Sequence, residues 1–199
     1  ENNKKSREYN ISKLYLSIIK NIFYVGYIYI LLLAGLFKYI NESLYNYDLS
    51  LYIVDLSSIL VTYLIIHISM LPFSFYSNFV IENKYEFNTS TKLLFFKDNL
   101  ISLLLTLIII SILSLVFFYI VAYKNHWWLL MSLTMFSVII ISMFIYPTYI
   151  SPIFNKFKKL KNENIKDEIK DLSERTDFSI DNLFVMDRSK RSKHPNAYF

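Results

Sequence analysis

A stretch with no charged residue, from Leu100 to Tyr123, constrains the fold of this chain more than any other feature. A helix needs about 20 apolar residues to cross the hydrocarbon core of a bilayer. Three further stretches are long and apolar enough to do the same, and they cover Ile22–Ile40, Leu51–Leu71 and Trp127–Tyr149. The sequence therefore predicts a mainly α fold with four membrane-spanning helices.

Composition supports a membrane protein and excludes several other classes. The 199 residues are 54% hydrophobic and include two glycines, which is far from the average of soluble domains. With no cysteine, the chain offers neither a disulfide scaffold nor a thiolate ligand or nucleophile. The net charge of +5 comes from residues that flank the apolar stretches. The predicted partner of these charges is therefore membrane lipid and not nucleic acid.

The distribution of lysine and arginine predicts the orientation in the membrane. Nineteen of the 21 basic residues lie before the first span, between the second and third spans, or after Tyr149, whereas Lys38 and Lys124 lie on the opposite side. Cytosolic loops carry the excess of positive charge in membrane proteins. We therefore expect both ends of the chain to face the cytosol. The predicted organisation is a cytosolic leader (1–20), a membrane region (21–150) and the start of a cytosolic domain (151–199).

The polar tail from Ser151 shows a short α+β pattern. Ile165, Ile169 and Leu172 recur on one helical face, which predicts an amphipathic helix over Asn162–Thr176. Residues Asn182–Asp187 are expected to form a short buried strand, and Asn196–Phe199 the beginning of another. The polar segment Tyr76–Asn99 is a second island, predicted to be a cytosolic loop. It contains enough phenylalanine, valine and isoleucine to pack against something at the membrane surface, for instance as an interfacial amphipathic element.

Few residues inside the spans could carry chemistry. His67 lies in the second span, His126 in an external loop and His194 in the tail, so no two have the spacing of metal ligands. We expect His67 to be a polar residue that faces the helix bundle. Asp55, an acid within the second span, would either line a polar chamber or, as we favour, reach the interface from one turn inside the helix.

Three blocks of the sequence together resemble the type I CAAX prenyl endopeptidases, membrane zinc metalloproteases that trim prenylated proteins. They are LPFSFYSNFVIENKYEFNTSTKLLFFKD (71–98), YPTYISPIFNKFKKL (146–160) and LFVMDRSKRSKHPNAYF (183–199). The KSREY motif at Lys5–Tyr9, with Lys13, is similar to the stretch that follows that family's first membrane helix. The resemblance runs in order along nearly the whole chain.

This resemblance implies an arrangement larger than the present chain. Family members have seven membrane helices, of which these four would be the second to fifth. The catalytic HExxH helix and the glutamate that is the third Zn²⁺ ligand would lie beyond Phe199, so we expect no catalytic or metal-binding residue here. The fragment alone should be inactive. The family also implies residence in the endoplasmic reticulum and a prenylated peptide or protein as substrate.

The resemblance assigns substrate-binding roles to the end of the chain. In this family a similar Asn-Ala-aromatic run forms the edge strand of the cleft, to which an extended substrate adds as a further strand. Asn196 would hold the substrate backbone, Ala197 would keep the edge open, and Tyr198, followed by Phe199, would bound a side-chain pocket. Lys190 and Arg191, with Lys193, would attract the substrate carboxylate or simply anionic lipid headgroups.

A different class of protein is compatible with the spans. A non-catalytic four-helix membrane protein, such as a transporter subunit or a scaffold, would show the same apolar stretches and the same charge pattern. It would leave the FVIENKYEFN segment (79–88) and the NAYF run (196–199) unexplained. The two alternatives differ in whether an HExxH motif follows.

Overall fold

Four long helices dominate the computed structural model, which describes residues 2–45, 47, 49–123, 125–176, 180 and 182–193. The helices are α1 (Asn2–Leu33), α3 (Leu51–Tyr76), α5 (Lys92–Tyr123) and α6 (Trp127–Ile145). Each belongs to a segment long and apolar enough to cross a membrane. The prediction of a mainly α, four-span protein is confirmed.

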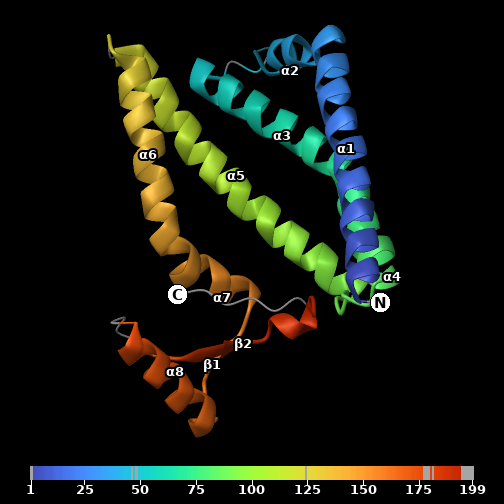
Figure 1. The fold of residues 1–199 in the computed structure, drawn as a ribbon. Coiled ribbons are helices and arrows are strands. Elements are labelled where there is room, and N and C mark those ends of the chain that lie inside the picture. Colours follow the sequence, from blue (N-terminus) through green and yellow to red (C-terminus); the bar gives the residue numbers. More distant parts are fainter. Residues whose placement is uncertain are drawn as a thin grey trace.

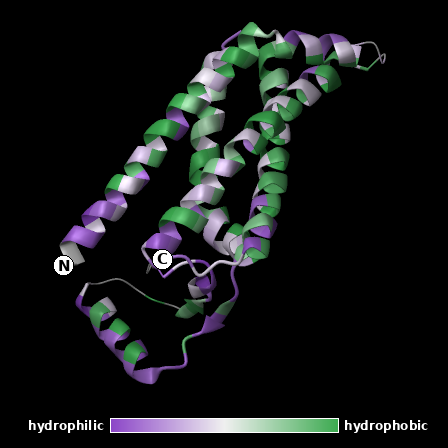
Figure 2. Ribbon diagram, turned by 90° about the vertical axis from the view of Figure 1, so that its right-hand side faces the viewer, coloured by the Kyte–Doolittle hydropathy of each residue, from purple (hydrophilic) through white to green (hydrophobic). Residues whose placement is uncertain are grey.

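The helices form two pairs that meet at one end of the molecule. Helix α1 packs on α3, α5 packs on α6, and α3 contacts α5 between the pairs (Figure 1). The N-terminus and helix α4 (Glu82–Lys84) lie at the lower end in this view, beside the start of α5. The long helices are mainly hydrophobic, and hydrophilic residues gather in the segment below them (Figure 2). That lower end holds most of the polar contacts described below.

The first helix begins and ends earlier than the span expected at Ile22–Ile40. It runs from Asn2 to Leu33, so the predicted leader is already helical. It stops because Gly35 adopts a φ of +68°, a conformation at helix C-termini that favours glycine. The chain then reverses into helix α2 (Leu36–Tyr45), which packs on α3. Ile40 belongs to that second helix, and the single span predicted there is wrong at its C-terminal end.

The segment Tyr76–Asn99 is mostly helical and not a loop. Helix α3 continues through a π-helical turn, η1 (Ser77–Ile81), into α4, and α5 begins at Lys92. The expected packing of its apolar residues is confirmed in part. Ile81 and Phe95 are each 5% exposed, whereas Val80 and Phe96 are exposed. Between α4 and α5 the chain turns at Glu86, whose φ of 64° is unusual for a residue other than glycine.

Helix α6 leads directly into the polar tail. It passes through a second π-helical turn, η2 (Tyr146–Ile150), and the short helix α7 (Ser151–Phe154). Strand β1 (Phe157–Lys159) then pairs in antiparallel register with β2 (Phe184–Met186). A 3₁₀ turn, η3 (Arg188–Lys190), follows β2. The tail is therefore attached to the bundle on the α6 side and returns toward α5.

The predictions for the tail are largely confirmed, with one correction. Helix α8 (Glu163–Arg175) forms as expected, with the Asn162 side chain accepting from the Asn164 and Ile165 amides at its N-terminus. Strand β2 forms within the predicted range, but it is not buried: Phe184 and Val185 are 56% and 52% exposed. Because successive side chains of a strand point to opposite faces, the exposure of Phe184 and Val185 shows that both faces of the two-stranded sheet are open at β2. The expected strand Asn196–Phe199 lies outside the described residues.

Candidate functional site

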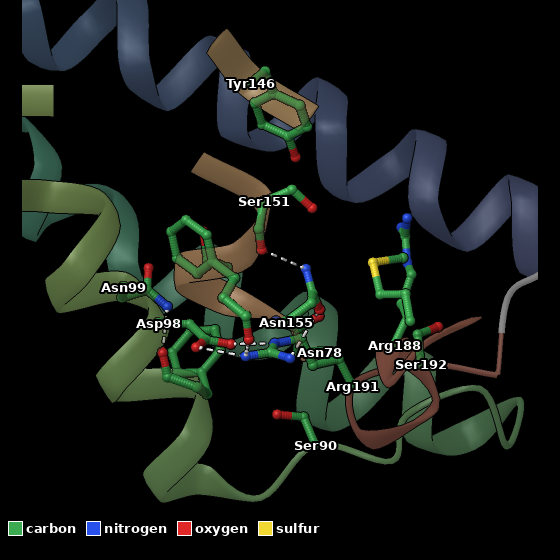
Figure 3. Close-up of a pocket in the computed structure, with 14 residues that line it drawn as sticks. Asn78, Ser90, Asp98, Asn99, Tyr146, Ser151, Asn155, Arg188, Arg191 and Ser192 are labelled. Atoms are coloured by element: carbon green, nitrogen blue, oxygen red, sulfur yellow. Dashed lines mark hydrogen bonds and ion pairs between the residues drawn. The ribbon is translucent and has the colours of Figure 1, made fainter. Parts of the chain in front are cut away.

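The three sequence blocks and the KSREY motif described above meet at one end of the bundle, although they are far apart along the chain. We call this region the junction and define it as residues 5–13, 74–99, 146–159 and 184–193. A cavity of about 510 Å³ lies within it, lined by residues of α3, η1, α5, η2, α7 and the tail (Figure 3). Most of the labelled side chains around this cavity are polar, with asparagine, serine and arginine prominent. The junction is thus a polar site at the end of an apolar bundle.

One side of the junction is organised around the buried carboxylate of Glu82. The residue is 8% exposed, and its Oε1 accepts hydrogen bonds from the Lys13 Nζ at 2.7 Å and the Tyr9 hydroxyl at 2.8 Å. Lys13 also donates to the Ser77 hydroxyl at 2.8 Å. A buried charge is tolerated when it is paired and hydrogen-bonded. Glu82 therefore ties the first turns of α1 to the end of the α3–α4 segment.

Aromatic contacts close this side of the junction. The Tyr9 ring meets Tyr85 and Phe87 edge to face, at centroid distances of 5.4 and 5.0 Å. Such geometry is favourable for aromatic pairs. A second aromatic group lies at the start of α5, where Phe95 contacts Phe75, Phe79 and Phe96. Together these rings hold the turn between α4 and α5 against its neighbours.

The other side of the junction is organised around Arg191. Its Nε and Nη2 donate to the two carboxylate oxygens of Asp98, at 2.6 and 3.0 Å. Nη1 donates to the Asn155 side chain at 3.1 Å, and Nη2 also donates to the Phe154 carbonyl at 2.6 Å. The Arg191 and Asp98 side chains are each 22% exposed, and hydrogen bonding to Asp98 raises the pKa of Arg191. One guanidinium thus joins α5, α7 and the tail (Figure 3).

Backbone pairing adds to this connection. The segment 87–89 runs antiparallel to 191–193, with a bridge between Asn88 and Ser192. The Lys193 amide donates to the Phe87 carbonyl at 2.9 Å, and the Thr89 amide donates to the Arg191 carbonyl at 3.4 Å. Main-chain bonds of this kind fix the register of the tail on the α4–α5 turn irrespective of side chains. The chain reaches Asn196 three residues after the last of these bonds.

Asp187 connects the end of β2 to the start of β1. Its carboxylate accepts from the Lys156 amide at 2.7 Å and pairs with Lys190 at 2.9 Å. The hydrogen bond from Lys190 and that from the Lys156 amide hold the pKa of Asp187 below its usual value of 3.8. The acid therefore stays ionised at neutral pH and supports the turn that leads to Arg191.

The structure places the predicted site residues unequally. Asn196, Ala197, Tyr198 and Phe199 lie outside the described residues, as does His194. Lys190 is exposed and paired with Asp187, whereas Arg191 is half-buried with all three guanidinium nitrogens engaged within the chain.

The residues considered for metal binding are not brought together. His67 is half-buried and packs on the Tyr63 ring, 5.8 Å between centroids, whereas His126 is exposed at the start of α6. Asp55 is half-buried in the second turn of α3, far along that helix from the junction. Within the described ranges, no group of three or more histidine and acidic side chains could hold a metal ion.

Sequence reasoning missed several residues that organise the junction. Glu82, Asp98 and Asn155 were not singled out, although each stands inside a block on which the resemblance rests. Arg188 also lines the cavity, and its side chain makes no hydrogen bond or ion pair with the part of the chain that the structure describes. Acid and amide residues inside otherwise aromatic blocks were the available signal, but their partners, 36 to 93 positions away along the chain, could not be predicted from the sequence.

Known proteins resemble this chain along its whole length. A sequence model of the CAAX prenyl protease N-terminal region, described as five membrane helices, matches residues 1–156. A CAAX prenyl protease 1 homolog of Dictyostelium discoideum is 35% identical over 100% of this chain and 48% of its own length. The CAAX prenyl protease 1 of Saccharomyces cerevisiae is 42% identical over 65% of this chain and 29% of its own.

A solved structure shares the fold. The crystal structure of S. mikatae Ste24p superposes with a TM-score of 0.87 at 32% sequence identity. The match covers 98% of this chain and 47% of the crystallised one. The chain therefore spans about half the length of the relatives that it matches most fully.

Proposed function

The chain belongs to the CAAX prenyl protease family, and from this premise we propose that it is the membrane-embedded N-terminal part of a zinc endopeptidase that cleaves prenylated CAAX-type proteins. This part supplies membrane helices and the substrate-binding edge strand, and by itself it is inactive. The observation that carries the proposal is the pairing of residues 191–193 with 87–89. That pairing anchors the tail to the bundle three residues before the Asn-Ala-aromatic run.

Substrate binding is assigned to the residues that follow this anchor. Asn196 would hold the substrate backbone through its side-chain amide, with Ala197, Tyr198 and Phe199 completing the edge. An extended peptide that adds to a strand gains main-chain hydrogen bonds without regard to its sequence. Of the basic residues proposed for the substrate carboxylate, Lys190 is the better candidate, because its side chain is 62% exposed. Arg191 already has partners within the chain.

Zinc is proposed as the cofactor of the whole enzyme, with its ligands outside this chain. The described residues contain no fitting ligand group, so none of them is assigned to the metal. The ligands would lie in the half of the relatives' length that this chain does not span. A bound zinc ion of this kind lowers the pKa of its water and polarises the scissile carbonyl.

The four apolar helices indicate a membrane protein. The orientation of its ends and the organelle that contains it are part of the proposal. Most apolar side chains of α5 and α6 are exposed in the chain, as expected for surfaces that meet lipid or further helices. We place both ends in the cytosol on the charge pattern, and the protein in the endoplasmic reticulum on the family. Glycosylation-acceptor tags at each end test the orientation: neither end should be glycosylated, and modification of either end would contradict it.

Cleavage by the full-length protein that carries this chain tests the activity. We expect the purified protein to bind one zinc ion by elemental analysis and to cleave a farnesylated CAAX peptide. Chelation should abolish cleavage, zinc should restore it, and the unprenylated peptide should be a poor substrate. The 199-residue chain, purified in parallel, should be inactive. Zinc-dependent cleavage by that chain alone would overturn the assignment of the catalytic residues.

Asparagine substitutions test the proposed edge strand. Asn196→Ala should raise the KM for the peptide about tenfold, the usual effect of leaving buried backbone groups without a partner. Asn182→Ala is the matched control, since Asn182 is exposed at the start of the β2 segment. Equal kinetics for the two variants would remove Asn196 from the substrate site. A protein that binds no zinc and cleaves no prenylated peptide would instead favour a non-catalytic membrane protein.

A further inference from the structure

Arg191 has the contacts of a structural connector and not of a free substrate-binding cation. Its five hydrogen-bond donors are arranged in a rigid planar fork. Two nitrogens engage both oxygens of Asp98, and the remaining contacts go to the Asn155 side chain and the Phe154 carbonyl. The partners come from the first two turns of α5 and from the C-terminal end of α7. The guanidinium therefore connects the two helical segments of the α5–α6 pair, α5 and the α7 end of α6, to the tail.

The neighbouring basic residues differ from Arg191 in this respect. Lys190 lies one residue earlier and pairs with Asp187 within the same turn. The Arg188 side chain lines the cavity without a hydrogen bond or ion pair to the described chain. Neither reaches a membrane helix in the contacts that the structure describes. Within the stretch 188–191, the long-range contact of the tail with α5 thus depends on one side chain, Arg191, through its pair with Asp98.

The backbone around Arg191 continues the same connection toward the proposed substrate strand. The Arg191 carbonyl accepts from the Thr89 amide at 3.4 Å, and the Lys193 amide donates to the Phe87 carbonyl at 2.9 Å. A change at the guanidinium would move this backbone, because the side chain and the main chain of Arg191 are bonded to different elements. Asn196 follows five residues after Arg191. A small displacement there is sufficient to misplace an incoming peptide.

We propose that Asp98 and Arg191 form a positioning pair, which sets the place of the substrate-binding strand relative to the membrane helices without touching the substrate. This inference rests on the proposed function, and it moves Arg191 from the substrate-carboxylate site to the support of the strand. Arg191 then controls how well an extended peptide binds, whatever its C-terminal group. Lysine cannot replace it, since an ammonium group cannot engage both Asp98 oxygens together with Asn155 and Phe154.

Kinetics of the full-length protein separate this role from simple loss of folding. We expect Arg191→Lys and Asp98→Asn each to raise the KM for a farnesylated CAAX peptide about tenfold and to change kcat less than threefold. A variant that merely folds less well would lower the apparent kcat, through a smaller active fraction, and leave KM unchanged. Arg175→Lys is the matched control, because Arg175 pairs with Asp171 on the exposed face of α8. It should leave both constants unchanged.

A peptide with an amidated C-terminus separates positioning from direct contact. If Arg191 positions the strand, Arg191→Lys raises KM by the same factor for the amide and for the free carboxylate. If Arg191 binds the carboxylate, the factor falls to about one for the amide, and the proposal is overturned. An unchanged KM for both peptides also overturns it. A wild-type protein that cleaves neither peptide refutes the proposed function itself, which is a distinguishable result.

The exchanged pair provides a second variant in case a single substitution fails to fold. Asp98→Arg combined with Arg191→Asp keeps the two charges in contact but loses the bonds to Asn155 and Phe154. We expect the double variant to bind the peptide more tightly than either Asp98→Arg or Arg191→Asp alone, but less tightly than the wild type, because the bonds to Asn155 and Phe154 are lost. If the losses of peptide affinity in the two single variants simply add in the double variant, the pair does not act as a unit.

Discussion

The junction and the middle of the membrane helices are stabilised in different ways. At the junction, polar side chains from distant parts of the sequence meet in pairs such as Glu82 with Lys13 and Asp98 with Arg191. Along α5 and α6, by contrast, the candidate spans bury no residue of their most apolar windows within the chain. Helices in lipid gain little from contacts between apolar side chains, since lipid tails are equally apolar. The position of the tail therefore depends on the contacts at the junction. The place of α5 and α6 in the membrane depends mainly on the hydropathy of their side chains.

The largest expected effect concerns the aromatic group of the junction. Phe95→Ala should destabilise the chain by about 3 kcal/mol, because Phe95 is 5% exposed and its removal leaves a cavity among three phenylalanines. Leu104→Ala, on the same helix but 52% exposed, should cost less than about 0.5 kcal/mol. Thermal unfolding in detergent micelles measures both. Equal shifts would contradict the contrast between the two regions.

An intermediate effect is expected at the Glu82 carboxylate. Lys13→Ala removes the ammonium group that donates to this buried acid at 2.7 Å and should cost about 2 kcal/mol. Lys38→Ala is the control, since the Lys38–Glu42 pair is exposed and 3.7 Å apart. Surface pairs contribute less than about 1 kcal/mol. The rate of amide hydrogen exchange at the start of α1 should rise in Lys13→Ala. An unchanged rate would contradict the anchoring role of Glu82.

The smallest effect is the acid response of the two-stranded sheet. Because the pKa of Asp187 is lower in the folded chain than its usual 3.8, its ionised form stabilises the contact between the end of β2 and the start of β1 above that pH. This contribution is lost as the pH falls below 3.8 through the folded pKa. The measurement is the protection factor of the Lys156 amide, which is its exchange rate relative to that of the unfolded chain at the same pH. Asp187→Asn should remove the pH dependence of this protection factor, whereas Asp171→Asn on the exposed face of α8 should not. Persistence of the dependence in Asp187→Asn would assign it to another group.

Local patterns predicted the elements well where one physical signal dominates. Continuous hydropathy identified α5, and the spacing of Ile165, Ile169 and Leu172 identified α8 within a residue at each end. The end of α1 was misplaced because hydropathy continues past Gly35, where the backbone and not the side chains stops the helix. The burial of β2 was wrong because a short apolar run does not reveal whether another layer covers it.

The sequence by itself determined the membrane-spanning fold, since a long apolar helix has no stable alternative to the bilayer. It also identified the family, through sequence blocks whose order along the chain matches that of the relatives. What the tertiary structure decided is the pairing at the junction: that Asp98 meets Arg191, that Glu82 meets Lys13, and that the segment 87–89 holds 191–193. Such contacts join residues 69 to 106 positions apart, and their partners are selected by the packing of the helices and not by any local pattern.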